Sequence, residues 1–346
     1  MSRHKLCYEK KTKNQELRLS NLQMGKDFKD VGAVYMEDNL WKNGSTIKIQ
    51  FLNDNSSGLF SPWAPASWTP MHVLENQQDV DGNIMRMDPI ENDIRILTPI
   101  EAVKKVVLDR IQPYVNLNFV FLDGVISDRV EGDIRIYFND LDGAWSVVGK
   151  DVGNYGISDP NVITMNLGWL DTGTILHEFC HALGMIHEHQ NPFENKIKWD
   201  REKVYEYFMG PPNNWDKDTI DANILDPPVG NLNGSNYDKD SIMLYYYPGS
   251  LTTDGKGTNQ NLTLSSTDAL WLYKKYPKEN LSSQEIKSRT ETIYKNMYPD
   301  SRFVPLESDN KNFKDIIDML SANTNVLIGL GVILLIVILY YLFKKD

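Results

Sequence analysis

One short stretch, HEFCHALGMIHEH, constrains the fold of this chain more than any other part of its sequence. It runs from His177 to His189 and holds four of the chain's six histidines. His177 and His181 are four positions apart, which places their rings one turn apart on the same face of a helix. Such a pair can bind one zinc ion. Glu178 lies between them and can reach a water on that ion without being a ligand.

The residues after this helix complete the pattern. Gly184 is suited to end a helix because glycine accepts the left-handed conformation at that position. The chain can then turn back so that His187 adds a third nitrogen, and the spacing reads H-E-x-x-H-x-x-G-x-x-H. The five-residue core alone also occurs by chance on surface helices, but the glycine and third histidine disfavour that alternative. The pattern predicts one Zn²⁺ per chain with a coordination position left open.

Two other residues of this stretch have simpler interpretations. Cys180 lies on the apolar face of the helix and is expected to be a small core residue rather than a nucleophile. His189 is expected to be a loop residue rather than a fourth ligand.

Strand and helix signals surround the motif. Thr98, Pro99 and Glu101 predict the start of a helix with a capping box, and a late helix is expected over residues 266–276. Alternating or short apolar runs predict five strands, at residues 46–52, 119–125, 133–138, 144–149 and 162–168. The predicted fold is therefore α+β, a twisted mixed sheet with two long helices followed by a loop-rich C-terminal subdomain.

The domain organisation follows from shifts in composition. Residues 39–277 are expected to form the folded domain, with an insertion over about 53–97 that is rich in proline, tryptophan and methionine. Residues 1–38 are polar and are interpreted as an N-terminal segment and candidate pro-region. Residues 278–324 are polar and are interpreted as a stalk.

The C-terminal end carries a strong membrane signal. Residues 326–343 are 18 uncharged and mostly apolar residues, which at 1.5 Å per residue can cross a hydrocarbon core of about 30 Å. This predicts a single transmembrane helix over 325–343, with a short tail at 344–346. The alternative is a buried core helix, which seldom runs this long without a polar position. We therefore expect a membrane protein anchored by its C-terminus.

Charge and cysteine content indicate which partners and which cellular compartment the domain is expected to have. The net charge of −11 at pH 7 argues against a nucleic-acid partner. Cys7 and Cys180 are the two cysteines and cannot build a disulfide framework, which is typical of a reducing compartment. The N-terminus has no apolar signal-peptide core. The domain is therefore expected to face the cytosol or the interior of a virion.

The extended motif resembles that of the astacin family of metzincin zinc endopeptidases. Glu188, directly after the third histidine, favours astacins over other metzincins, which remain a second interpretation. The sequence SIMLYYY at residues 241–247 resembles the family's Met-turn, although Leu244 replaces the usual histidine. By this resemblance Met243 would lie beneath the metal, and Tyr245 would bind zinc weakly before stabilising the oxyanion. Looser similarity extends over about residues 39–277.

The resemblance implies a zinc endopeptidase in which Glu178 activates the attacking water. A protein or peptide substrate would bind extended along residues 133–138, which are expected to be an edge strand. The alternative is a non-catalytic, zinc-containing, membrane-anchored binding or structural protein, which the presence of both Glu178 and Tyr245 disfavours. The absence of disulfides departs from secreted astacins and would suit a virus-encoded relative.

Overall fold

The computed structural model describes residues 33–52, 88–122, 131–139, 143–150, 163–211, 213–228 and 231–297. All of these lie in the first of two units, which covers residues 1–301. The predicted transmembrane helix at 325–343 and most of the predicted insertion lie outside the described residues. Within the described ranges, no helix is long and apolar enough to span a bilayer.

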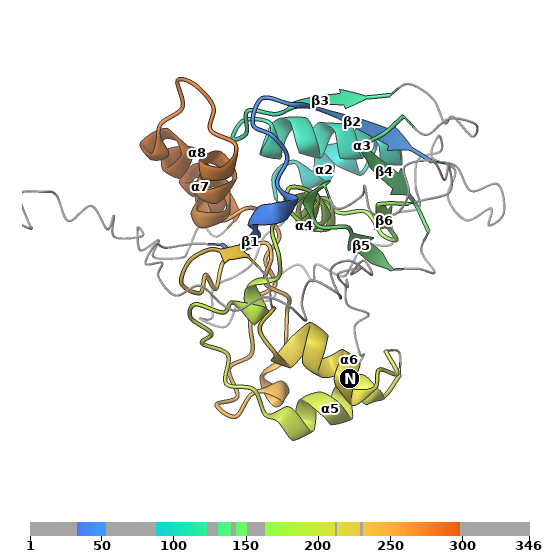
Figure 1. The fold of residues 1–346 in the computed structure, drawn as a ribbon, viewed down its shortest axis with the longest axis vertical. Helices are drawn as coiled ribbons and strands as arrows, with labels where there is room; N and C mark the ends of the chain where they lie inside the picture. Colours follow the sequence, from blue (N-terminus) through green and yellow to red (C-terminus); the bar gives the residue numbers. More distant parts are fainter. Residues whose placement is uncertain are drawn as a thin grey trace, which may run out of the picture. The chain divides into compact units, whose positions relative to one another are not determined.

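The predicted mixed sheet is present and has five strands in the order β3-β2-β4-β6-β5 (Figure 1). The strands are β2 (Thr46–Phe51), β3 (Asn118–Phe121), β4 (Ile134–Tyr137), β5 (Ala144–Ser146) and β6 (Met165–Leu167). The pairs β2–β3, β2–β4 and β4–β6 are parallel, and β5 alone runs antiparallel to its neighbour β6. Each strand overlaps one of the five predicted from the sequence.

The predicted edge position of residues 133–138 is wrong. β4 lies between β2 and β6, and all four of its residues are buried. The alternation of isoleucine with Arg135 suggested one face in solvent, but Arg135 is only 2% exposed. The edge strands of this sheet are β3 and β5.

The helix predicted from the capping box begins where expected. In α3 (Pro99–Val106), the Glu101 N–H donates to Thr98 Oγ1 and the Thr98 N–H donates to Glu101 Oε2. A π-helical turn, η2 (Val107–Ile111), continues it. The late helix is α7 (Ser266–Lys275). The remaining helices are α2 (Glu91–Ile94), α4 (Thr172–Ala182), α5 (Arg201–Met209), α6 (Lys217–Ile220) and α8 (Ser283–Met297).

The apolar interior forms one main core and a second large cluster. The main core joins the sheet to α3, α4 and α7. The second cluster packs α5 and α6 against the segment around Tyr245 and Tyr247, and Figure 1 shows these two helices apart from the sheet. The loop-rich C-terminal part expected from the sequence is therefore organised around its own small apolar centre.

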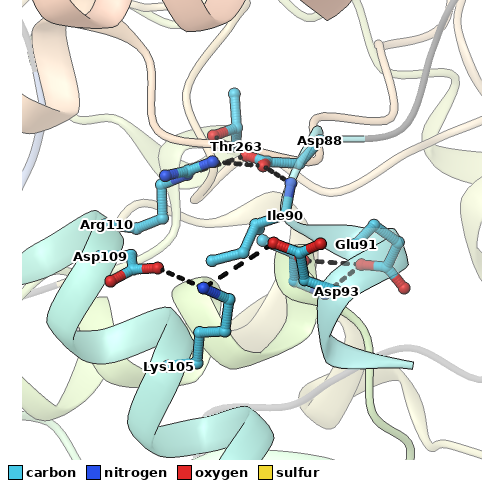
Figure 2. A network of polar contacts seen from close by, with 9 residues as sticks. Asp88, Ile90, Glu91, Asp93, Lys105, Asp109, Arg110 and Thr263 are labelled. Atoms are coloured by element: carbon cyan, nitrogen blue, oxygen red, sulfur yellow. Dashed lines mark hydrogen bonds and ion pairs between the residues drawn. The ribbon is translucent and has the colours of Figure 1, made fainter. Parts of the chain in front are cut away.

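The end of the predicted insertion is part of the packed fold. Figure 2 shows Asp88 between Arg110 and Thr263: Arg110 Nη2 donates to Asp88 Oδ1 at 2.8 Å, and Thr263 Oγ1 donates to Oδ2 at 2.9 Å. The Asp88 carboxylate is almost fully buried, and Ile90 and Ile94 belong to the main core. Residues 88–97 therefore connect η2 to the chain before α7.

The packed unit extends beyond the predicted domain limits at both ends. Ala33 and Val34 are fully buried, and β1 (Tyr35–Met36) pairs antiparallel with β7 (Leu232–Asn233). Beyond Pro277, Leu281 and Ile286 join the main core. Residues 1–38 and 278–324 are polar over most of their length, which hides the few apolar positions that pack. The rest of the predicted domain layout stays a prediction.

Two carboxylates fix the start of α4. Asp171 is the N-cap residue, and its Oδ1 accepts a hydrogen bond from the Thr174 N–H at 2.8 Å. Glu91 Oε2 accepts from both the N–H and the hydroxyl of Thr172, at 2.8 and 2.6 Å. The amide groups at this helix end are thereby satisfied in a buried setting.

Replacing Asp171 by asparagine is expected to stabilise the protein at neutral pH. Burial raises the pKa of Asp171 from 3.8 to about 6. The stability contributed by this raised pKa is complete below about pH 4 and is lost as the pH rises through about 6. Two pKa units correspond to about 3 kcal/mol, and asparagine caps helices equally well.

Thermal unfolding of both proteins at several pH values checks this. The Tm gain of Asp171→Asn should be largest above about pH 7 and shrink towards pH 4. Asp216→Asn is the matched control, because Asp216 caps α6 in solvent and its hydrogen bonds to Thr219 lower its pKa. A gain for Asp171→Asn that is independent of pH would contradict the prediction.

Candidate metal centre

Helix α4 carries the first two predicted ligands into the interior. All of its residues are buried, from Thr172 to Ala182, and the helix contacts β5 and β6 of the sheet (Figure 1). Leu176, Phe179 and Cys180 belong to the main core. The apolar positions predicted from the sequence are thus confirmed, and Cys180 is a buried free thiol.

The predicted end of this helix at Gly184 is confirmed. Gly184 has a φ of 100°. Its N–H donates to the His181 carbonyl at 2.8 Å, and the Met185 N–H donates to the Cys180 carbonyl at 2.9 Å. This is a Schellman motif, which needs a left-handed residue at this position. A Cβ here would also lie 2.7 Å from Leu40 Cδ2, so glycine is required on two grounds.

Remote segments hold the bend after α4. The Ala182 carbonyl accepts from Trp41 Nε1 at 2.7 Å, and the Leu183 carbonyl accepts from the Tyr276 hydroxyl at 2.7 Å. On the other side, the Met36 N–H donates to the Gly184 carbonyl and the Ile186 N–H donates to the Val34 carbonyl, both at 3.0 Å. The direction of the chain from α4 to His187 is therefore set by the N-terminal strand and by α7.

The three predicted histidine ligands converge. One ring nitrogen from each of His177, His181 and His187 lies within 4.8 Å of the others, and the Nε2 atoms of His181 and His187 are 3.0 Å apart. His177 Nδ1 is 2.8 Å from the Ile242 carbonyl, and His181 Nδ1 is 2.8 Å from the Met185 carbonyl. These carbonyls fix the tautomers, so both Nε2 atoms face the common point.

This geometry fits a zinc ion. Zinc–nitrogen bonds of about 2.0–2.1 Å in a tetrahedral site separate two ligand nitrogens by about 3.3 Å, close to the separation of the His181 and His187 nitrogens. His177 Nε2 is buried and has no hydrogen-bond partner among the described residues. A buried imidazole nitrogen without a donor is costly unless a metal binds it.

Burial keeps the first two rings neutral. It lowers the pKa of His177 to about 4, and it lowers the pKa of His181 well below the ordinary value, with a further contribution from His177. Neutral imidazole is the form that binds a metal. Both rings can therefore bind a cation without first losing a proton.

The aromatic ring of Tyr245 packs against the histidine cluster. It lies 5.0 Å from the His177 ring in a stacked arrangement and 4.4 Å from the His187 ring, between centroids. Met243 is fully buried in the main core, and its carbonyl accepts from the Glu188 N–H at 3.0 Å. The segment 241–247 thus places Tyr245 against two of the histidine rings and Met243 in the main core, and the Met-turn roles of both residues stay predictions.

A family model for the astacin peptidases matches residues 125–264, which include α4, the Schellman bend and the Met-turn. This stretch of the chain is similar to the astacin family. The predicted resemblance is therefore confirmed.

Individual astacin-family proteins match a smaller region. Zinc metalloproteinase nas-8 from Steinernema carpocapsae is 32% identical over 111 residues, which are 32% of this chain and 23% of that protein. Zinc metalloproteinase dpy-31 from Teladorsagia circumcincta is 29% identical over 133 residues, 37% of this chain and 19% of that protein. The match thus spans less than a quarter of the length of these relatives.

A solved structure extends the similarity of the fold. The structure of myroilysin has a TM-score of 0.51 and 29% sequence identity, and the alignment covers 72% of this chain and all of that one. The mixed α+β architecture of this chain is therefore similar to that of a solved structure over the whole length of that structure.

Both glutamates of the astacin motif are fully buried. Glu178 lies on α4 directly after His177. Glu188 Oε1 accepts from Asn191 Nδ2 at 2.9 Å and from the Asp238 N–H at 2.7 Å, and burial raises its pKa well above the usual range. Glu188 therefore ties the start of the loop after the third histidine to the segment before the Met-turn.

His189 is not among the converging ligands, as predicted, but it lies in a buried 3-10 turn, η4 (Glu188–Gln190), rather than in a loop. It is fully buried, its ring lies 5.1 Å from the His187 ring and 5.4 Å from the Tyr245 ring, and Nε2 is 2.9 Å from the Asn223 carbonyl. Its position depends on contacts with η5 (Asp221–Leu225), which no spacing in the sequence reveals.

Proposed function

We propose that this chain is a zinc-dependent endopeptidase. The observation that carries the proposal is the convergence of three histidine nitrogens within 4.8 Å, with Glu178 on the same helix. The match of residues 125–264 to the astacin family model supports it, as do relatives named zinc metalloproteinases. His177, His181 and His187 would hold one Zn²⁺.

Glu178 and Tyr245 would carry out the catalytic steps that the metal does not. Zinc, when bound, supplies a Lewis acid that polarises the scissile carbonyl and lowers the pKa of a water. Glu178 would accept the proton of the attacking water and pass it to the leaving amine. The Tyr245 hydroxyl would donate a hydrogen bond to the oxyanion that develops at the carbonyl.

The substrate is proposed to bind as an extended peptide along β5 rather than β4. β5 is an edge strand, antiparallel to β6, and it contacts α4, which carries the first two ligands. An extended peptide can add to such an edge through backbone hydrogen bonds.

Attachment to a membrane is part of the proposal. It is supported by the apolar stretch at 326–343, whose length suits one passage through a bilayer. The catalytic domain would face the cytosol or a virion interior, because a sequence with only two cysteines is typical of a reducing compartment.

Hydrolysis of casein by the purified full chain tests the function. We expect turnover that a zinc chelator removes and that added Zn²⁺ restores. Stoichiometric zinc without hydrolysis would instead support the non-catalytic binding or structural alternative. Hydrolysis that persists in metal-free protein would contradict the proposed mechanism.

Replacing Tyr245 by phenylalanine is expected to lower kcat by roughly 100-fold, the usual effect of removing one oxyanion donor. Phenylalanine keeps the ring that packs on His177 and His187, so the fold and zinc content should be unchanged. Steady-state kinetics on a peptide substrate measure the effect. Tyr246→Phe is the matched control, because that side chain is 46% exposed, and an equal loss there would contradict the assigned role.

A further inference from the structure

Asp268 lies outside the metal centre but is connected to it through one residue. It lies in the first turn of α7 and is fully buried. Its Oδ2 accepts a hydrogen bond from the Ile242 N–H at 2.8 Å. The carbonyl oxygen of the same Ile242 lies 2.8 Å from His177 Nδ1. The residue that orients the first ligand is therefore itself held by Asp268.

The same carboxylate fixes the neighbouring residues of the Met-turn. Ser241 Oγ donates to Asp268 Oδ1 at 2.7 Å, and the Met243 N–H donates to Ser241 Oγ at 3.1 Å. The Ser265 N–H also donates to Oδ2, at 3.0 Å. Three consecutive residues, 241 to 243, thus depend directly or indirectly on one side chain of α7.

Asp268 does more than cap its own helix. Helices α3 and α8 also begin with capping boxes, formed by Thr98 with Glu101 and by Ser282 with Glu285. In both of these the hydrogen bonds stay within the cap and are exposed. A cap alone therefore does not require a buried carboxylate, which is costly unless hydrogen bonds compensate it.

Burial and the nearby Asp238 raise the pKa of Asp268 to about 7, a measure of how unfavourable this position is for a charge. Two of the three hydrogen bonds that compensate it come from the Met-turn, from Ser241 and Ile242.

We propose that Asp268 is a positioning residue of the metal centre. It fixes the Ile242 carbonyl, and this carbonyl holds the His177 ring so that Nε2 points to the metal. Groups that orient a histidine ligand from behind change metal affinity by about 10- to 100-fold when they are lost. The proposal rests on zinc binding by the proposed site and does not depend on peptide hydrolysis.

The test is the zinc dissociation constant of the metal-free full chain, titrated with Zn²⁺ in competition with a chromophoric chelator. Asp268→Ala is expected to weaken binding by at least about 10-fold. Asp268→Asn keeps one side-chain carbonyl oxygen that can accept from Ile242, so it should restore most of the affinity. Glu285→Ala, which removes the exposed capping carboxylate of α8, should leave zinc affinity unchanged.

Ser241→Ala is the second variant if Asp268→Ala does not fold. It removes the donor to Asp268 Oδ1 and the acceptor of the Met243 N–H, and it should weaken zinc binding by several-fold. Unchanged affinity in either folded variant would overturn the proposal, as would an equal loss in Glu285→Ala. Zinc binding that depends on Asp268 in a chain that hydrolyses no peptide would contradict the proposed function and support this inference.

Discussion

Replacing Glu178 by glutamine is expected to lower peptide hydrolysis by about 1000-fold while zinc remains bound, because a general base contributes about 10²- to 10⁴-fold. Glutamine has nearly the same shape as glutamate but cannot accept the proton of the attacking water. Glu178 is fully buried on α4 beside the first ligand. Turnover of a fluorogenic peptide and zinc content, measured on the same sample, separate the loss of the base from the loss of the metal.

Glu202→Gln provides the comparison for this variant. Glu202 is exposed near the start of α5, so its substitution should leave both turnover and zinc content unchanged. Near-normal hydrolysis by Glu178→Gln would exclude Glu178 as the base, even if zinc were present in full.

Replacing His187 by leucine is expected to remove stoichiometric zinc and, with it, hydrolysis. Zinc sites are worth about 10 kcal/mol or more. Loss of one of three protein ligands should therefore cost about 3 kcal/mol, or over 100-fold in affinity. Metal analysis of the purified protein after dialysis against a weak chelator measures the effect.

His189→Leu is the matched variant for this prediction. His189 stacks on His187 but is not one of the converging ligands, so this variant should retain zinc. If zinc were lost from His189→Leu and kept by His187→Leu, the ligand assignment would be wrong.

The metal centre could be predicted because most of its geometry is local. His177, His181 and Gly184 lie within one helix and its end, where spacing alone determines which side chains share a face. The capping box of α3 was predictable for the same reason. The order of the strands was not, since the burial of Arg135 depends on which segments lie on either side of β4.

The supporting role of residues around the site also could not be predicted from the sequence. Asp268 holds Ile242 across 26 positions, and Glu91 caps Thr172 across 81 positions. A single aspartate or glutamate in a polar stretch carries no sign of such a partner. These contacts arise only when separate elements pack together, so periodicity and spacing do not reveal them.

The pairing of residues 34–36 with the bend after α4 limits where this chain can be shortened. A chain that begins at Asn39 would lack the Val34 carbonyl and the Met36 amide, and with them two hydrogen bonds that hold Gly184 and Ile186. The third histidine follows Ile186 directly, so such trimming would loosen the segment that presents it. Any proteolytic maturation that keeps these two hydrogen bonds must therefore cut before Val34, upstream of the limit at residue 38 that polarity alone suggests.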